Sequence, residues 1–154
     1  YNSFLGGVFT KVDRINRNKN YCILLADKYL IKDNVATKLN SGDTVSIGDQ
    51  VEVRLVVMAD NAFEFVYIED PKPATFEAEK LLSTWVYDGL YHYQEMQNAQ
   101  TNFYMDNLPK GTYEIKYYLR PTAEGLYKVG ATNLQSMYAP EFSAHSSNFE
   151  IRVK

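Results

Sequence analysis

The chain has 154 residues, a length that fits one domain with a hydrophobic core of its own. Its net charge of −3 comes from interspersed acidic and basic residues, so there is no basic stripe to neutralise phosphates and we expect no nucleic-acid partner. No apolar run approaches the ~20 residues of a membrane-spanning helix, so we expect no direct membrane insertion by this segment. The 13 tyrosines favour strands, where an aromatic ring fits a half-buried surface.

The first twenty residues differ from the rest of the chain. Residues 6–9 have the composition of a strand that belongs to something else, and residues 13–20 form a polar connector rich in Asn and basic side chains. The chain begins at Tyr1 with no Met and no signal-peptide pattern, which indicates a fragment or a processed product. We therefore expect a lead-in over residues 1–20 and a domain over residues 21–154.

Period-two alternation of apolar and polar side chains predicts the three clearest strands, over residues 51–58, 113–120 and 149–154. Each has one apolar face and one mixed or charged face, as expected of antiparallel strands that cover one side of a core. Weaker strands are predicted over residues 21–31, with a break at Asp27-Lys28, and over residues 44–47, 63–68, 91–97, 101–105, 126–129 and 134–138. In the strand over 63–68, Phe63, Phe65 and Tyr67 are expected to share one face.

Turn residues separate these strands, and many short strands at this spacing predict an all-β fold, a sandwich or a barrel. Residues 98–100 are expected at the tip of a hairpin, and residues 74–87 are ambiguous between one or two helical turns and an irregular crossing between sheets. The turn over residues 108–111 leads into Tyr113, which resembles the tyrosine corner of immunoglobulin-like sandwiches. The simpler alternative is that Tyr113 is only a core residue. We favour an antiparallel β-sandwich of the immunoglobulin or fibronectin type.

A search for catalytic chemistry finds no enzyme signature. Cys22 is the only cysteine and lies in an apolar run, so we interpret it as a buried small hydrophobe. His92 and His145 lack metal-ligand spacing, and no nucleophile elbow, phosphate loop or dinucleotide fingerprint is present. We expect no catalytic residue, no metal and no cofactor.

Acidic residues leave one enzymatic alternative open. Glu69, Asp70 and Glu77 would suit glycoside hydrolysis if the fold held two of them across a cleft. The simpler interpretation of Glu69 and Asp70 is that they solvate the turn that begins at Pro71.

Aromatic residues gather at Tyr87, Tyr91, His92 and Tyr93. Exposed aromatic rows on β-sandwiches can stack sugars, so Tyr91 and Tyr93 are candidates for the contact surface of a carbohydrate-binding or adhesion module. The alternative is that these rings belong to the core or to an interface.

Five segments occur in an order that resembles a known family; they cover residues 67–71, 89–95, 101–106, 108–113 and 135–142. The chain, over about residues 21–154, resembles the last macroglobulin-like domain of bacterial alpha-2-macroglobulin-type proteins. Ser-Met-Tyr-Ala-Pro-Glu-Phe, at residues 136–142, is the most specific segment. The resemblance implies a β-sandwich at the C-terminus of a large, multidomain protease inhibitor of the bacterial cell envelope, anchored through the upstream chain.

In that family a protease cleaves a bait region, and in many members a helical domain carries a Cys–Gln thioester that captures the protease. The resemblance implies that the last domain packs against this helical domain and shields the thioester from water, with Met137 and Tyr138 as the covering residues. The alternative for this pair is a strand end packed into its own core. The thioester motif Cys-x-Glu-Gln is absent here, since Cys22 is followed by Ile-Leu-Leu. The implied partners are therefore other domains of the parent chain, and proteases only through the full-length protein.

Overall fold

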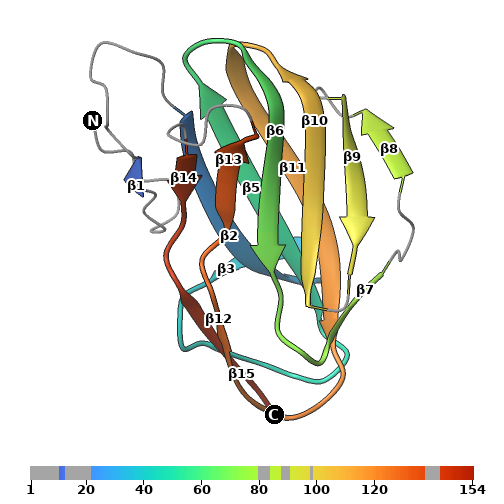
Figure 1. Cartoon of the computed structure of the whole chain (residues 1–154). Coiled ribbons are helices and arrows are strands. Elements are labelled where there is room, and N and C mark those ends of the chain that lie inside the picture. The colour runs from blue at the N-terminus through green and yellow to red at the C-terminus, as the bar shows by residue number, and fades with distance from the viewer. Residues whose placement is uncertain (1–10, 13–21, 80–83, 88–90, 98, 138–142) are drawn as a thin grey trace.

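The structure is a computed structural model that describes residues 11–12, 22–79, 84–87, 91–97, 99–137 and 143–154. These residues form strands and turns with no helix, and the two larger sheets face each other as a sandwich (Figure 1). The all-β sandwich predicted from the alternation of side chains is therefore confirmed. Of the lead-in expected over residues 1–20, all but Lys11 and Val12 lies outside the described residues.

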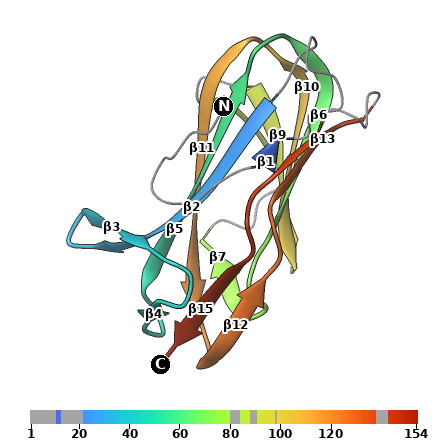
Figure 2. The ribbon, with the colours of Figure 1, turned by 90° about the vertical axis from the view of Figure 1, so that its left-hand side faces the viewer.

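Two sheets form the sandwich, and a third, smaller one closes its lower end in Figures 1 and 2. The front sheet in Figure 1 has the strand order β1 (Lys11–Val12), β14 (Ser143–His145), β13 (Asn133–Ser136), β6 (Phe63–Pro71), β10 (Gln100–Leu108), β9 (Tyr91–Met96) and β8 (Thr84–Tyr87). The back sheet has the order β3 (Val35–Leu39), β2 (Cys22–Lys32), β5 (Gln50–Ala59), β11 (Gly111–Pro121) and β7 (Phe76–Ala78). The small sheet joins β12 (Gly125–Val129), β15 (Phe149–Val153) and β4 (Thr44–Val45).

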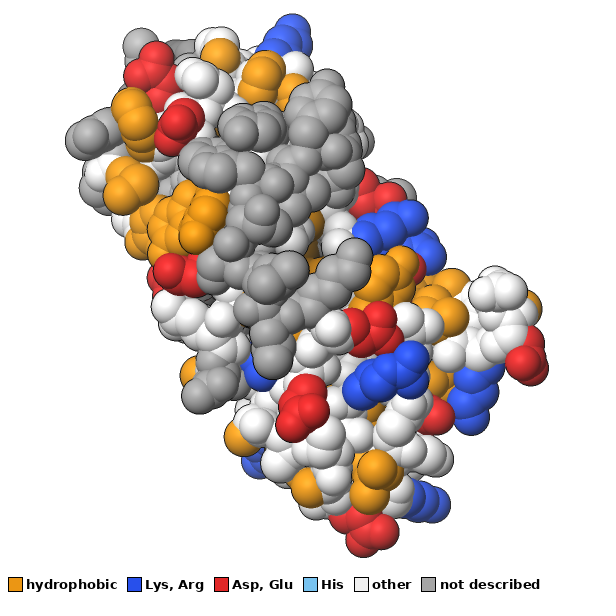
Figure 3. All heavy atoms as spheres, turned by 90° about the vertical axis from the view of Figure 1, so that its right-hand side faces the viewer, with side chains coloured by type: hydrophobic (Ala, Val, Ile, Leu, Met, Phe, Trp, Pro, Cys, Tyr) orange, Lys and Arg blue, Asp and Glu red, His pale blue; other side chains and the backbone are white. Residues whose placement is uncertain are grey.

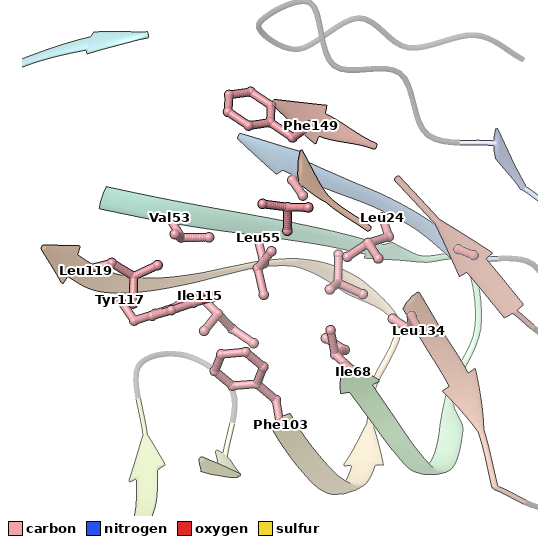
Figure 4. Close-up of a cluster of buried hydrophobic side chains, with 14 of the residues drawn as sticks. Leu24, Val53, Leu55, Ile68, Phe103, Ile115, Tyr117, Leu119, Leu134 and Phe149 are labelled. Carbon is pink, nitrogen blue, oxygen red and sulfur yellow. The ribbon is translucent and has the colours of Figure 1, made fainter. Parts of the chain in front are cut away.

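Inward and outward positions alternate along β5, β11 and β15, as the sequence predicts. In the antiparallel pairing of β5 with β11, Leu55 lies opposite Ile115, and both side chains are fully buried. From the other sheet, Ile68 of β6 and Phe103 of β10 point toward them, so both sheets contribute to one core (Figure 4). The ring of Phe103 lies 5.7 Å from that of Tyr117, between centroids.

The strand β2 does not break at Asp27-Lys28, so the expected interruption is wrong. Both residues are buried, at 5% and 7% exposure, and β2 stays paired with β5 along its length. The two charges are tolerated because Asp27 lies 3.6 Å from the Lys38 ammonium group, and the Lys28 ammonium group lies over the ring of Phe149.

The shared face predicted for Phe63, Phe65 and Tyr67 is also wrong. Phe63 points into the core, but Phe65 has a left-handed backbone with φ of +52° and a side chain that is 37% exposed. The alternation is shifted at this point, so that Val66 and Ile68 take the next inward positions. A left-handed φ is energetically costly for an aromatic residue. The sequence around Phe65 does not indicate this backbone conformation.

Residues 74–87 cross between the sheets, which was one of the two predicted alternatives. Their described parts are β7, which pairs with β11 in the back sheet, and β8, which pairs with β9 in the front sheet. The helical alternative is wrong for these described residues. The hairpin predicted next is confirmed, because β9 and β10 are antiparallel with Met96 opposite Thr101.

Two tyrosines fold back over glycines at the starts of their strands. Tyr113 donates a hydrogen bond from its hydroxyl to the carbonyl oxygen of Lys110, at 3.4 Å, which confirms the predicted tyrosine corner. Tyr127 repeats the arrangement, with its hydroxyl 3.0 Å from the carbonyl oxygen of Ala123. Each tyrosine stands two residues after a glycine, and only the first of the two was predicted from the sequence.

Candidate functional site

Met137 lies at the end of the pairing between β13 and β6. Ser136 is the last residue of β13 and lies opposite Val66, and the Met137 amide then donates a hydrogen bond of 2.8 Å to the carbonyl oxygen of Phe65. The Met137 side chain is 55% exposed and that of Phe65 is 37% exposed. These two exposed apolar residues are neighbours through this backbone hydrogen bond, and we call the pair the Met137–Phe65 rim.

The structure places Met137 outside the core, and its predicted companion Tyr138 lies outside the described residues. Phe65 is a member of the rim that sequence reasoning missed. Its strand pattern suggested an inward side chain, and only the left-handed backbone turns it outward.

Tyr93, the second candidate, belongs to a row of tyrosines across the front sheet. Tyr104 of β10 lies opposite both Tyr67 of β6 and Tyr93 of β9 in the strand register. The Tyr67 and Tyr104 rings are 6.4 Å apart between centroids and inclined by 31°. All three side chains are half-buried on the outer face of the sheet, and we call them the tyrosine row.

The other members of the aromatic cluster do not extend this row in the described structure. His92 points to the opposite face, where it is fully buried with its ring 5.9 Å from that of Phe103. The side chains of Tyr87 and Tyr91 lie outside the described part of the chain.

A row of polar side chains runs beside the tyrosine row on the same face. Asn102 donates a hydrogen bond of 3.1 Å to Glu95, and Gln100 donates to both Asn102 and Glu69, at 3.0 and 3.3 Å. Amide and carboxylate groups next to flat aromatic rings match the hydroxyls and apolar faces of sugars.

The three acidic residues considered for hydrolysis do not meet. Glu69 lies on the outer face of β6, and Asp70 points inward with 1% exposure. Glu77 is exposed on β7 of the other sheet. This arrangement does not form the facing pair of carboxylates that glycoside hydrolysis requires.

Asp70 is instead the centre of a buried polar cluster. The hydroxyl of Tyr117 donates a hydrogen bond to one carboxylate oxygen, and Thr132 Oγ1 donates to the other at 2.6 Å. Burial raises the pKa of Tyr117 well above its ordinary value, and the Asp70 charge raises it further. Burial lowers the pKa of Lys28, while Asp70 and Asp27 oppose that shift.

Cys22 is buried, as predicted, with 4% exposure. Burial, with a smaller contribution from the charge of Asp60, raises the pKa of its thiol to about 12. A thiol with such a pKa is almost entirely protonated at neutral pH, and the thiolate is the nucleophilic form.

Two features are absent from the described residues. They contain no group of three or more His, Cys, Asp or Glu side chains that could hold a metal ion. They also contain no helix with the length and hydropathy needed to cross a membrane. On the face shown in Figure 3, acidic and basic side chains are interspersed rather than gathered by sign.

The facing antiparallel sheets and the tyrosine corner define an immunoglobulin-like β-sandwich domain. The family model described as the bacterial alpha-2-macroglobulin MG10 domain matches residues 27–141, so the chain belongs to this family. The match confirms the resemblance that the ordered segments indicated. It does not address a position at the C-terminus of a parent protein, which stays a prediction.

Solved structures of bacterial alpha-2-macroglobulins share the fold. A tyrosine-to-glycine mutant of Salmonella alpha-2-macroglobulin aligns with a TM-score of 0.67 and 19% identity over 85% of this chain and 9% of that one. Native alpha-2-macroglobulin from Escherichia coli, from domain MG7 to the C-terminus, aligns with a TM-score of 0.63 and 18% identity over 84% of this chain and 23% of that one. The chain thus spans less than a quarter of either structure. No curated protein matches it.

Proposed function

We propose that the chain is a non-catalytic structural domain of an alpha-2-macroglobulin-type, broad-range protease inhibitor. In this proposal it packs through the Met137–Phe65 rim against the helical, thioester-type domain of the same molecule. The observation that carries the proposal is the 55% exposure of Met137, within the segment that most specifically resembles the family. Exposed apolar side chains that gather together mark contact surfaces more often than isolated ones do.

The chemistry of the rim suits a cover over a reactive bond. A thioester is lost when water or a small amine attacks its carbonyl carbon and releases the cysteine thiolate. An unbranched Met side chain can adapt to an irregular surface, and an aromatic ring adds apolar area that excludes water. Cleavage of a bait region elsewhere in the parent would move the domains apart and remove the cover.

The proposal also implies which partners the domain contacts and where the parent protein is located. Its direct partners are the other domains of the parent chain, and it meets proteases only through the full-length inhibitor. The parent is expected in the cell envelope, periplasmic or surface-exposed, and anchored through its upstream part. Sequencing upstream of Tyr1 tests this directly, because a parent with neither a bait region nor a helical repeat domain would contradict the proposal.

The shielding role is tested by the methylamine reactivity of the full-length parent, if its upstream sequence contains a Cys-x-Glu-Gln motif. Met137→Ala should speed the release of the thiol severalfold, and Phe65→Ala should act in the same direction. Val35→Ala is the matched control, because Val35 is also an exposed apolar residue, at 61%, but lies on β3 of the back sheet. Equal rates in wild type and Met137→Ala would remove the shielding role.

Glycan binding is a second candidate function, and the tyrosine row is the observation that favours it. Stacking of sugar rings on neighbouring strands would use Tyr67, Tyr104 and Tyr93, with Glu95 as a hydrogen-bonding group. The test is binding of the chain to a broad glycan panel. Tyr93→Ala and Tyr104→Ala should each weaken binding, whereas Tyr29→Ala on the back sheet should not. The absence of any bound glycan would exclude this function.

A further inference from the structure

A small pocket opens beside β2, away from both the Met137–Phe65 rim and the tyrosine row. Its volume is about 110 Å³. It is bounded by β2, by the turn that follows β3, and by the segments that follow β12 and β14. Among its lining residues are Lys28, Asn40, Ser41, Thr132, Asn148 and Phe149.

Lys28 supplies the charge of this pocket. Its side chain is more than nine-tenths buried, and its ammonium nitrogen lies 4.5 Å from the centroid of the Phe149 ring, another lining side chain. Within the described part of the chain, its ammonium group forms no hydrogen bond and has no carboxylate within ion-pair distance. A buried ammonium group without a hydrogen-bonded anion remains costly, because the contact with the Phe149 ring replaces only part of its hydration.

The two acidic side chains whose charges act on Lys28 already interact with other groups. Asp27 lies 3.6 Å from the Lys38 ammonium group, and Asp70 accepts hydrogen bonds from Tyr117 and Thr132. The charges of both carboxylates raise the pKa of Lys28, but neither carboxylate forms an ion pair with its ammonium group. The open space next to Lys28 is therefore the place where an anion could contact it directly.

The other lining residues match the oxygens of an anion. Ser41 accepts a hydrogen bond through its Oγ from the Glu150 amide, at 2.9 Å, which leaves its hydroxyl proton available for a ligand. Asn40 and Asn148 also line the pocket, and Asn side chains carry amide donors. Thr132 and Ser146 form two hydrogen bonds with each other, each of 2.9 Å, and give the pocket a rigid wall.

We propose that this pocket binds a carboxylate group, with Lys28 as the contacting cation. The volume is well below the roughly 300 Å³ at which pockets for drug-sized ligands begin, so only a small group enters. The charges of Lys28, Lys38, Asp27 and Asp70 sum to zero, so the bound carboxylate is stabilised by direct contact and not by a general positive field. We therefore expect weak binding, with a dissociation constant on the order of millimolar for a free ligand.

A carboxylate can reach the pocket from two sources: a free small acid, or an Asp or Glu side chain of another domain of the parent protein. The first arm of the test is a titration of the isotope-labelled 154-residue chain with sodium formate and sodium acetate, followed by NMR. Sodium chloride at equal ionic strength is the control for a general salt effect. Saturable shifts at the amides of Thr132, Ser146 and Asn148 would support the proposal.

Lys28→Met should abolish these shifts, because it keeps the length of the side chain and removes the charge. Lys32→Met is the matched control on the same strand, since the Lys32 side chain is 62% exposed, and its titration should resemble that of wild type. If Lys28→Met does not fold, the Lys28 side-chain resonances of the wild-type chain provide the same information. Shifts that persist in folded Lys28→Met, or no saturable shift with either acid, would overturn the proposal.

The second arm separates the two sources. If a side chain of the parent fills the pocket, the intact parent should not respond to acetate at Lys28 although the isolated chain does. If the ligand is a free acid, both proteins should respond alike. Either pattern supports carboxylate binding, and a lack of response in both overturns it.

Discussion

Asp70 carries a carboxylate into the space between the two large sheets, where different segments hold its two oxygens. Tyr117 comes from the back sheet, Asp70 from the front sheet and Thr132 from the segment after β12. The cluster therefore links three parts of the fold. Buried hydrogen bonds of this kind contribute little when complete but are costly when one partner is removed.

Tyr117→Phe should lower the free energy of unfolding by about 2 kcal/mol, because it leaves one oxygen of a buried carboxylate without its donor. Urea denaturation followed by circular dichroism measures the change. Tyr113→Phe is the control on the same strand, since the Tyr113 hydroxyl donates to an exposed backbone carbonyl, that of Lys110, and its loss should cost less. A double-mutant cycle with Thr132→Val should show coupling, and additive costs would mean that the two hydroxyls act independently.

Cys22 should be inert in the folded chain. Because its thiol pKa is raised to about 12, no reaction with a disulfide reagent is expected at pH 8, whereas the chain unfolded in urea should react at once. The same shift makes folding depend on pH. Between pH 9 and about 12 the unfolded thiol loses its proton and the folded one keeps it, so stability falls as pH rises.

The size of this alkaline loss is about 1.4 kcal/mol per pH unit from one group. Cys22→Ala should remove that part of the slope and leave the part caused by buried tyrosines. Rapid labelling of the native protein at pH 8, or equal slopes in both proteins, would contradict the assignment.

At the level of elements, the two tyrosine–glycine turns set the starts of β11 and β12. Gly111 and Gly125 have φ of +147° and +148°, and a β-carbon at either position would lie 3.3 Å from the nearest atom of the following tyrosine side chain. Each strand therefore begins at a position where only glycine fits without strain.

Gly111→Ala and Gly125→Ala should each destabilise the chain by roughly 1–3 kcal/mol, because the backbone is strained and the tyrosine must move. Thermal unfolding measures both variants. Gly130→Ala is the control, since its added β-carbon would meet only Pro71 at 4.0 Å. A cost for Gly130→Ala equal to the others would show that the tyrosine contact is unimportant.

Elements with regular alternation could be predicted from the sequence, and those with a local exception could not. Alternation along β5, β11 and β15 required nothing beyond one buried and one open face. The outward side chain of Phe65 depends on one unusual φ. The burial of Asp27 and Lys28 depends on Lys38, which lies on the neighbouring strand β3, and on Phe149, which is remote in sequence. Such tertiary partners leave no local pattern.

The residues of the candidate sites also differ in whether the sequence could predict them. Met137 could be nominated because a short, specific segment contains it, but Phe65 joins it only through the pairing of β6 with β13. The Lys28 pocket could not be foreseen at all. Its lining residues are of ordinary types and come from four separate segments, which only the fold brings together.

For the whole molecule, one continuous core predicts one cooperative transition. The core cluster includes residues of both large sheets and of the small sheet, such as Ile115, Phe103 and Ile151. A domain built this way unfolds as a unit. A destabilising substitution in one sheet should therefore lower the stability of the other sheets as well.

Ile151→Ala in the small sheet should cost about 2–5 kcal/mol, since Ile151 is 1% exposed. Hydrogen exchange should show the same loss of protection at amides of β10 and β5 as at those of β15. Arg152→Ala, at the exposed neighbouring position, should change stability by no more than about 0.5 kcal/mol. Loss of protection confined to β15 would indicate that the small sheet unfolds separately.

The pairing of β15 also has a consequence for synthesis on the ribosome. Arg152 lies beside Thr44 in a parallel pair, so an early strand must wait for one of the last residues of this sequence before its edge is covered. Contacts so far apart in sequence form slowly, and exposed strand edges invite association with other chains. A change that delays the docking of β15 would thus reduce the amount of protein recovered from cells more than it changes the melting temperature of the molecules that fold.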